Sequence, residues 1–403
     1  MELDVSTARW LVSEPGLAAV AAATTARDHD EDPLRILERR RADGLTRQRA
    51  AAVLAAAEAR RRARDRWPDA DALLFTREAL EQASDPVVSR WRARRFAATE
   101  VLDLCAGIGG DALALAAAGA RVTAVDLDEA RLVLLAHNAA VRGLEVRTRV
   151  ADALAVRSGP DRWVHADPAR RRGERRVRAL RDHRPPVGEL VARHGTAAGL
   201  GIVLSPAVDL ADPDLPDGEV EFIQLDADLV EAVTWLGGAR DGNAAASATL
   251  LPAGAHLVRT GPPTPLAPGP VGDLLVEVAP AAVRARLHDH LGARIGARRV
   301  AAGRALLTVD GDVPGSPWYR RRPVEVVLPA RPKVVRRWLR TADELPVEIV
   351  LHGVAVDPGE WWRALGRPPR GPQGRRIELI RTDAGATAVI TRAVAPVARA
   401  DGG

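Results

Sequence analysis

Four acids stand at or near the ends of successive apolar runs in the stretch from about residue 99 to residue 170. They are Asp103, Asp126, Asp152 and Asp167. Apolar runs that alternate with helix-like segments are typical of a parallel α/β sheet. The carboxyl ends of parallel strands meet at one sheet edge, where ligands of such folds bind. We therefore expect these carboxylates to surround one ligand site.

A glycine-containing turn, Gly107-Ile108-Gly109-Gly110, follows the first run and leads into an alanine- and leucine-rich helix at 112–118. Glycine permits unusual backbone angles and close approach of the backbone to a ligand. The start of the following helix offers N–H groups that have no partner within the helix. Asp126 ends the next strand, where a carboxylate can accept hydrogen bonds from both ribose hydroxyls. This arrangement predicts a site for a cofactor that contains a nucleoside.

Two cofactor classes fit this turn. The spacing Gly107-x-Gly109-x-x-Ala112 satisfies the loose dinucleotide fingerprint, with Asp126 at about the expected 20-residue interval. Asp103 favours S-adenosylmethionine instead, because a carboxylate there would repel a pyrophosphate and attract the cofactor's ammonium group. An S-adenosylmethionine-dependent methyltransferase is therefore the leading hypothesis. An NAD(P)-dependent oxidoreductase is the alternative from a different class.

The glycine turn and the four acids, in this order, resemble the class I S-adenosylmethionine-dependent methyltransferases. The resemblance implies a Rossmann-like α/β core in which Asp126 holds the ribose and Asp103 lies near the methionine amine. It also implies that Asp152 approaches adenine. The cofactor-binding residues on this interpretation are Asp103, Cys105, Gly107, Gly109, Asp126, Asp152 and Ala153.

The candidate catalytic element is Asp167-Pro168, at the end of the fourth strand. The carboxylate and nearby carbonyls could accept hydrogen bonds from an amine or ring N–H, which would orient the nitrogen lone pair toward the methyl group. The next residues, Ala169 and Arg170, depart from the Asp/Asn-Pro-Pro-Tyr form that stacks a flipped base. Cys105 lies in the cofactor turn, so methylation of a pyrimidine carbon through a cysteine nucleophile is not expected.

The densest positive segment follows the catalytic element directly. It contains Arg170, Arg171, Arg172, Arg175 and Arg176, and continues to Arg178 and Arg181. Charged runs usually solvate a surface, but the phosphates of a polynucleotide would pass at this place. We expect RNA contacts here and at a second basic loop, Arg367–Arg376. A non-catalytic RNA-binding protein that retains the cofactor pocket is a further alternative.

The composition narrows the class of protein. A chain of 403 residues predicts two or three domains, and a single cysteine excludes an internal disulfide and a cysteine-ligated iron–sulfur cluster. The net charge is only +5, and the high pI reflects arginine in place of lysine. No apolar run approaches the roughly 20 residues of a membrane span, and the first residues lack signal-peptide order. We expect a cytoplasmic protein without membrane contact.

We expect no metal at His288-Asp289-His290, whose imidazoles would lie on different sides of a helix.

Four segments follow from the pattern. Residues 1–92 are helical, 93–262 form the methyltransferase core, 263–323 are a linker with a connecting α/β segment, and 324–403 form a compact α/β domain. Within these segments the pattern predicts a loop after Asp167-Pro168, one strand at 248–259 and one helix at 281–291. This layout resembles a bacterial family in which a class I methyltransferase core precedes a small THUMP-like domain. The resembling segments are 75–83, 94–96, 103–111, 167–171 and the tail from about 324. The resemblance implies methylation of RNA, and the Asp167-Pro168 element favours a base nitrogen of a structured RNA, either tRNA or rRNA. Because the two basic loops belong to different domains on this interpretation, we expect removal of residues 324–403 to weaken RNA binding and spare cofactor binding.

Overall fold

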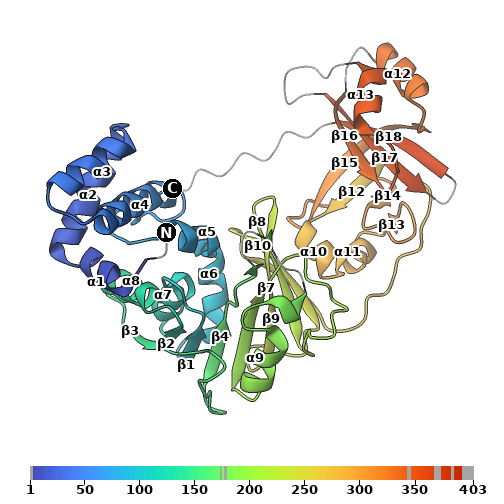
Figure 1. The fold of residues 1–403 in the computed structure, drawn as a ribbon. Coiled ribbons are helices and arrows are strands. Elements are labelled where there is room, and N and C mark those ends of the chain that lie inside the picture. The colour runs from blue at the N-terminus through green and yellow to red at the C-terminus, as the bar shows by residue number, and fades with distance from the viewer. Residues whose placement is uncertain are drawn as a thin grey trace. The chain divides into compact units, whose positions relative to one another are not determined.

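The computed structural model describes residues 3–172, 175–176, 179–342, 346–366, 374–382 and 385–392 (Figure 1). Four of these residues, Arg171, Arg172, Arg175 and Arg176, are described by their backbone alone. The chain divides into two compact units. The first comprises Met1–Ala246 and Leu251–Gly254, and the second comprises Ser247–Leu250 and Ala255–Gly403.

Helices form the N-terminal part of the first unit, as predicted. They are α1 (Val5–Leu11), α2 (Glu14–Asp28), α3 (Pro33–Ala42), α4 (Arg47–Ala63), α5 (Arg77–Gln82) and α6 (Pro86–Ala93), with the 3-10 turn η1 (Arg94–Phe96) at the end. An Asp, Ser or Thr side chain caps each of the six N-termini by accepting a backbone N–H. Their apolar core includes Ile108, Ala130 and Leu134 from beyond residue 100. The helical region therefore packs against the rest of the unit.

Seven strands of the first unit pair in the order β3-β2-β1-β4-β7-β9-β8. They are β1 (Glu100–Leu104), β2 (Arg121–Asp126), β3 (Val146–Val150), β4 (Trp163–Ala166), β7 (Gly199–Leu204), β8 (Glu219–Leu225) and β9 (Asp228–Gly237). The first five in this order are parallel, and β9 is antiparallel to both of its neighbours. The chain order reverses between β1 and β4. Open α/β sheets bind their ligands at such a reversal, outside the carboxyl ends of the strands.

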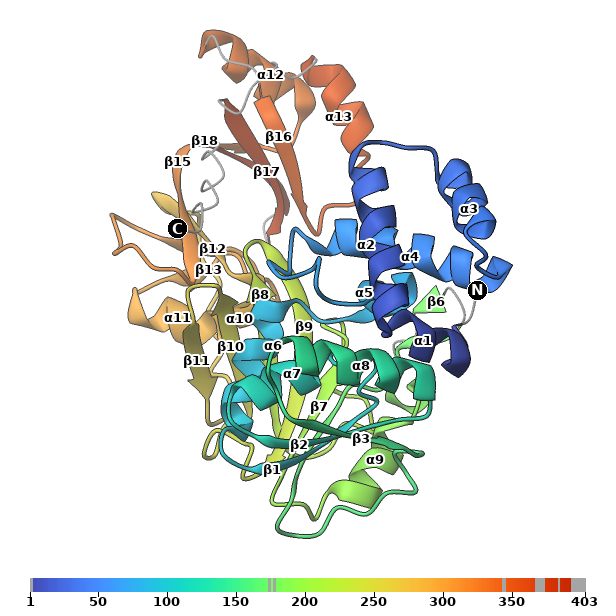
Figure 2. The same cartoon turned by 90° about the vertical axis from the view of Figure 1, so that its left-hand side faces the viewer.

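Helices cover the sheet and fix its loops. α7 (Gly110–Ala117) and α8 (Glu129–Val141) lie across β1–β3, and α9 (Val187–His194) follows the turn η2 (Leu180–Asp182) on the other side (Figure 2). α8 also contacts α1. The Asn138 side chain accepts the Leu74 N–H at 2.8 Å and donates to the Leu74 carbonyl at 3.0 Å. The predicted Rossmann-like α/β core is confirmed.

The segment after β4, predicted as a loop, contains a short antiparallel ribbon. Its strands are β5 (Arg171–Arg172) and β6 (Arg175–Arg176). The register pairs each arginine of β5 with an arginine of β6. At the base of the ribbon, Ala169 and Arg184 exchange two backbone hydrogen bonds of 2.9 and 3.0 Å. The arginine-rich segment is thus a ribbon anchored beside the end of β4.

The second unit contains a seven-stranded sheet in the order β13-β14-β12-β15-β18-β17-β16. Its elements are β12 (Leu274–Val278), α10 (Pro280–Arg284), α11 (His288–Arg294), β13 (Arg298–Arg299), β14 (Leu307–Val309), β15 (Tyr319–Pro329), α12 (Pro332–Thr341), β16 (Pro346–His352), α13 (Pro358–Leu365), β17 (Arg375–Thr382) and β18 (Gly385–Arg392). Across the described ranges, no helix combines the length and the apolar character needed to cross a bilayer.

Two element predictions were wrong in detail. Residues 248–259, expected as one strand, form β10 (Ala246–Leu251) and β11 (Ala255–Arg259), because Pro252 and a positive-φ Gly254 intervene. Residues 281–291, expected as one helix, form α10 and α11, which Arg286 separates with a φ of 56°. The boundary expected at residue 323 falls inside β15, which pairs with β12 on one side and β18 on the other.

Candidate functional site

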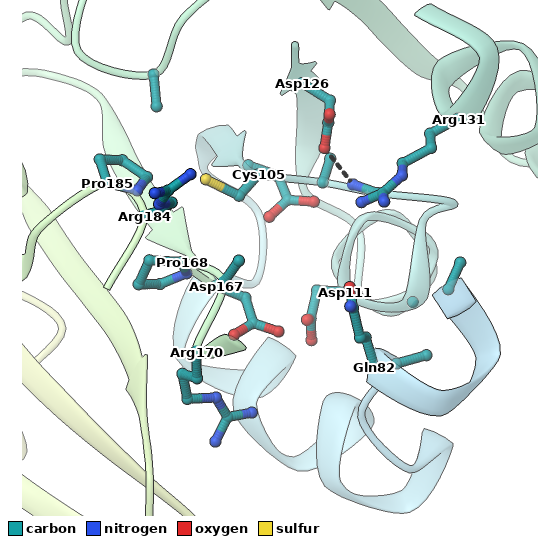
Figure 3. A pocket seen from close by; sticks show the side chains of 18 of the residues that line it. Gln82, Cys105, Asp111, Asp126, Arg131, Asp167, Pro168, Arg170, Arg184 and Pro185 are labelled. Atoms are coloured by element: carbon teal, nitrogen blue, oxygen red, sulfur yellow. Dashed lines mark hydrogen bonds between the residues drawn. The ribbon is translucent and has the colours of Figure 1, made fainter. Parts of the chain in front are cut away.

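A cavity of about 1170 Å³ lies at the carboxyl ends of β1, β2, β3, β4 and β7 (Figure 3). One part of its wall comes from the loops after β1, β2 and β3. The other part comes from the loops after β4 and β7 and from α5 with the residues that follow it. The cavity brings together most of the predicted site: Asp103, Cys105, Gly107, Asp126, Asp152, Ala153, Asp167, Pro168 and Arg170 all line it.

Gly109 is the one predicted cofactor residue that does not line the cavity. Its φ is 99°, at the N-terminal cap of α7, and a Cβ there would lie 2.8 Å from Cγ of Leu135. Glycine is therefore required at this position for the turn and for packing against α8. Cys105 and Gly107 also have positive φ, of 61° and 56°. The loop after β1 is thus held in a conformation that brings its backbone to the cavity.

Asp126 is fixed between two loops. One carboxylate oxygen accepts the Gly107 N–H at 2.8 Å (Figure 3), and the other accepts the Asp128 N–H at 2.9 Å. At the end of β3, Asp152 accepts the Leu154 N–H at 2.9 Å. Leu127, which directly follows Asp126, lines the cavity and is 72% exposed. Leu127 lies between Asp126 and Asp128 in the sequence, so it offers an apolar surface beside polar groups.

Asp103 forms a buried pair with His165 of β4. His165 Nδ1 lies 2.7 Å from Asp103 Oδ1, and each residue is only 1% exposed. Within the described residues, the second oxygen of Asp103 and Nε2 of His165 have no hydrogen-bond partner. Burial raises the pKa of Asp103, although the hydrogen bond with His165 opposes this effect. Burial alone would lower the pKa of His165, but Asp111 and Asp103 outweigh it and raise that pKa.

Arg92 links three elements beneath the cavity. It is 1% exposed, and its guanidinium contacts Asp111 at the start of α7 and Glu231 of β9. The Ser84 hydroxyl, on the cavity wall, donates to Glu231 at 3.1 Å. Burial would raise the pKa of Asp111, but the charge of Arg92 outweighs it and holds that pKa below its usual value. Dense charge in a helix usually indicates a solvated face, but Arg92 is buried and paired.

Asp167, which follows β4, and Asp111, in the first turn of α7, extend toward the same part of the cavity (Figure 3). Burial raises the pKa of Asp167; Arg170 opposes this shift, while Asp111 adds to it. Arg170 is itself held by a hydrogen bond of 3.1 Å from its Nη1 to the Leu204 carbonyl. A carboxylate with a raised pKa accepts a proton more readily, so Asp167 suits contact with an N–H group.

The part of the wall formed by the loops after β4 and β7 is rich in proline and arginine. Its described lining includes Pro168, Pro185, Pro186 and Pro206, together with Arg170 and Arg184, and it contains no aromatic side chain. Cys105 lies on the other side, where burial, followed by the charge of Asp126, raises the pKa of its thiol. A neutral thiol is a poor nucleophile, which agrees with the expectation that Cys105 performs no covalent chemistry.

The second basic loop expected at 367–376 is wrong for its last two members. Arg375 and Arg376 lie buried on β17, where Arg375 pairs with Glu325 at 2.6 Å and Arg376 with Glu378 at 2.6 Å. Arg367 and Arg370 lie outside the described residues. Asp289 pairs with Arg299, and the described ranges hold no group of three or more His, Cys, Asp or Glu residues placed to bind a metal.

Several lining residues were not predicted from the sequence. They are Gln82, Ser84, Asp111, Leu127, Arg131, Arg184 and Ser205. Ser205 could have been found, because it directly follows β7, a neighbour of β4 in the same parallel set. Gln82, at the end of α5, and Ser84, between α5 and α6, follow no strand of the sheet, so the argument from strand ends does not reach them.

Comparisons with known proteins cover most of the chain. A sequence model of a methyltransferase domain matches residues 101–165. An uncharacterized S-adenosylmethionine-dependent methyltransferase of Mycobacterium tuberculosis strain H37Rv is 32% identical over 322 residues, which cover 79% of this chain and 87% of that protein. A crystal structure of a methyltransferase candidate from Porphyromonas gingivalis W83 has a TM-score of 0.75 at 20% identity, covering 95% of this chain and 99% of that one. This last similarity concerns the fold.

Proposed function

We propose that this chain, which belongs to the family of S-adenosylmethionine-dependent methyltransferases, methylates a nitrogen atom of a base in structured RNA. S-adenosylmethionine is its methyl donor. Family membership sets aside both the NAD(P)-dependent oxidoreductase and the non-catalytic RNA-binding protein. The observation that carries the RNA proposal is the arginine ribbon anchored directly beside Asp167, at the edge of the cavity.

The cofactor would occupy the part of the cavity formed by the loops after β1, β2 and β3. Asp126 would accept the ribose hydroxyls, because Gly107 and Asp128 already fix its carboxylate. The unpartnered, buried oxygen of Asp103 fits the ammonium group of the methionine part, since a buried carboxylate oxygen requires a donor. When bound, the cofactor supplies a methyl group on a positively charged sulfur.

Adenine would lie beside Asp152 and Ala153, on the side of the cavity formed by the β3 loop. The exposed Leu127 would give this ring an apolar surface. A nucleoside cofactor needs both polar groups that fix its orientation and apolar surface that accepts its base. The β2 and β3 loops offer both kinds of contact.

The methyl acceptor would enter between the loops after β4 and β7. Asp167 would accept a hydrogen bond from the acceptor N–H, orient its lone pair and hold the proton that the methylated nitrogen releases. The cavity, at about 1170 Å³, exceeds the roughly 300–1,000 Å³ usual for one small-molecule site. Its size therefore leaves room for the cofactor and for part of a second molecule.

The charge around the ribbon favours a polyanionic acceptor. Eight arginines and two acids lie between residues 170 and 184. The ribbon register places arginine opposite arginine, and like charges directly opposite each other destabilise a strand pair. Phosphate groups would supply the missing negative charge. Without an aromatic side chain in the described lining, a target base would lie against proline rings and guanidinium planes, of which the latter are known to stack on RNA bases.

The test compares nucleosides from the total RNA of a deletion strain and its parent by mass spectrometry. We expect one N-methylated nucleoside to be missing from the deletion strain. RNA from that strain should then be methylated by the purified wild-type protein with labelled S-adenosylmethionine. An Asp167→Ala variant should not transfer the label. If no nucleoside disappears and the label enters protein or small molecules instead, the RNA assignment is wrong.

A further inference from the structure

Helix α12 of the second unit carries a row of positive charges. They are Lys333, Arg336, Arg337 and Arg340, and each lies three or four residues from two of the others. Residues at these spacings are neighbours on one face of a helix. All four are exposed, and α12 contains no acidic residue. We refer to these four residues as the α12 stripe.

The opposite face of α12 is committed to the core of its unit. Val335 and Leu339 are buried there, in a cluster that includes Trp361 and Leu365 of α13 and Ile377 of β17. This packing fixes the orientation of the helix and turns the stripe outward. A helix that lies on a membrane inserts its apolar face into the lipid. That face is already covered in α12, so a membrane does not fit the stripe.

The residues of the α12 stripe lack the ion-pair partners that other arginines of the same unit have among the described residues. Arg322 pairs with Glu277 at 3.0 Å, Arg298 with Asp310 at 2.8 Å, and Arg375 with Glu325 at 2.6 Å. In the described part of the chain, no carboxylate lies within ion-pair distance of the four stripe residues. Like charges at these spacings destabilise a helix, and the described residues offer nothing that offsets the cost. A negatively charged partner would offset it.

We propose that the α12 stripe binds the phosphate backbone of the RNA substrate. This inference rests on the proposed function and replaces the basic loop expected at 367–376, in which Arg375 and Arg376 are buried. At 1.5 Å per residue the stripe is about 10 Å long, which spans more than one phosphate of a duplex strand, spaced about 3.4 Å along the axis. Such contacts position an RNA without reading its sequence.

The test uses two full-length variants with the same change in charge. The stripe variant is K333Q/R336Q/R337Q/R340Q, in which glutamine preserves helix propensity. The control variant is R35Q/R41Q/R47Q/R62Q, which removes four exposed arginines from the N-terminal helices. Point variants are preferable to removal of residues 324–403, because that cut would divide β15 between the segment that pairs with β12 and the segment that pairs with β18. Calorimetry with S-adenosylhomocysteine checks that each variant retains its cofactor site.

Binding is measured by filter binding to the small-RNA fraction of the deletion strain over a series of salt concentrations. We expect the stripe variant to bind at least about tenfold more weakly at low salt, with a salt slope smaller by roughly 3, since each lost phosphate contact removes about 0.7–0.9. The control should change much less. The proposal is overturned if the two variants weaken equally, or if the stripe variant binds RNA normally but loses affinity for phosphatidylserine vesicles. If the wild type itself shows no salt-dependent RNA binding, the proposed function fails as well.

Discussion

His165 Nδ1 lies 2.7 Å from Asp103 Oδ1, and the two residues are register partners on the adjacent strands β4 and β1. The pair is almost fully buried beneath the cavity, and the remaining oxygen of Asp103 has no hydrogen-bond partner among the described residues. A charged partner at this distance favours the ionised carboxylate, although burial opposes ionisation. His165 therefore acts as a positioning residue that holds Asp103 toward the cavity.

This relationship predicts a selective effect of changing His165. His165→Leu should weaken binding of S-adenosylhomocysteine about tenfold, because Asp103 would lose the hydrogen bond that holds its carboxylate and the charge that opposes the effect of burial on its pKa. Binding of 5′-methylthioadenosine, which lacks the amino acid chain, should be almost unchanged. Calorimetry measures both, and His165→Asn serves as the conservative control with partial recovery. Equal loss for the two ligands would show that His165 only fills space.

The next prediction concerns the ribose site. Asp126→Ala should weaken S-adenosylhomocysteine binding by about 1.5–3 kcal/mol, the range for hydrogen bonds to a charged group. Asp126→Asn keeps one acceptor oxygen and should lose less. Asp161→Asn, a change of an exposed acid away from the cavity lining, is the matched control. An unchanged dissociation constant in a folded Asp126→Ala protein would place the ribose elsewhere.

A third prediction concerns the stability that Arg92 provides. Arg92→Met leaves Asp111 and Glu231 buried without their partner, and removal of one member of a buried ion pair costs about 3–5 kcal/mol. Urea unfolding at neutral pH measures this loss. Arg62→Met, at an exposed position, should cost little.

The stability that Arg92 provides should depend on pH, because Arg92 stabilises the ionised form of Asp111. In the wild type the pKa of Asp111 is below the usual 3.8 of an aspartate, so its contribution to stability is present above that value. The contribution is lost as the pH falls through the lowered folded pKa. The difference between the wild type and Arg92→Met should therefore shrink as the pH drops below about 4. A difference that stays constant in acid would mean that Arg92 stabilises by packing alone.

The sequence predicts the position of the acids well, for a physical reason. Parallel strands end at one edge, so acids at successive strand ends must meet there regardless of the exact element bounds. Asp126, Asp152 and Asp167 needed no further information to be grouped. The His165–Asp103 pair was also within reach, since both residues lie inside central strands that the pattern makes neighbours.

The burial of several arginines could not be predicted from the sequence, because it depends on contacts between distant segments. Arg92 and its partner Glu231 are 139 positions apart in the sequence, and Arg375 and its partner Glu325 are 50 positions apart. Local composition shows only that arginines are dense, and dense charge usually means a solvated face. Which of them receive carboxylate partners depends on the tertiary fold. The contribution of Gln82 and Ser84 to the cavity wall depends on it too.

The last prediction tests Asp167 through its neighbour Arg170. Asp167 can take up a proton only when it is ionised, and its pKa is raised above the usual 3.8. The rate of methyl transfer should therefore rise with pH through this raised pKa and level off above it. Arg170 lowers the pKa of Asp167, so Arg170→Gln should move the acid limb of the rate profile to higher pH. Arg181→Gln, an exposed change in the same segment, should weaken RNA binding at most and leave the limb in place.

The measurement is the pH profile of labelled methyl transfer to RNA from the deletion strain, at saturating cofactor. A limb that does not move in Arg170→Gln would show that another group controls the acid side, and Asp167→Asn would then be expected to retain its activity.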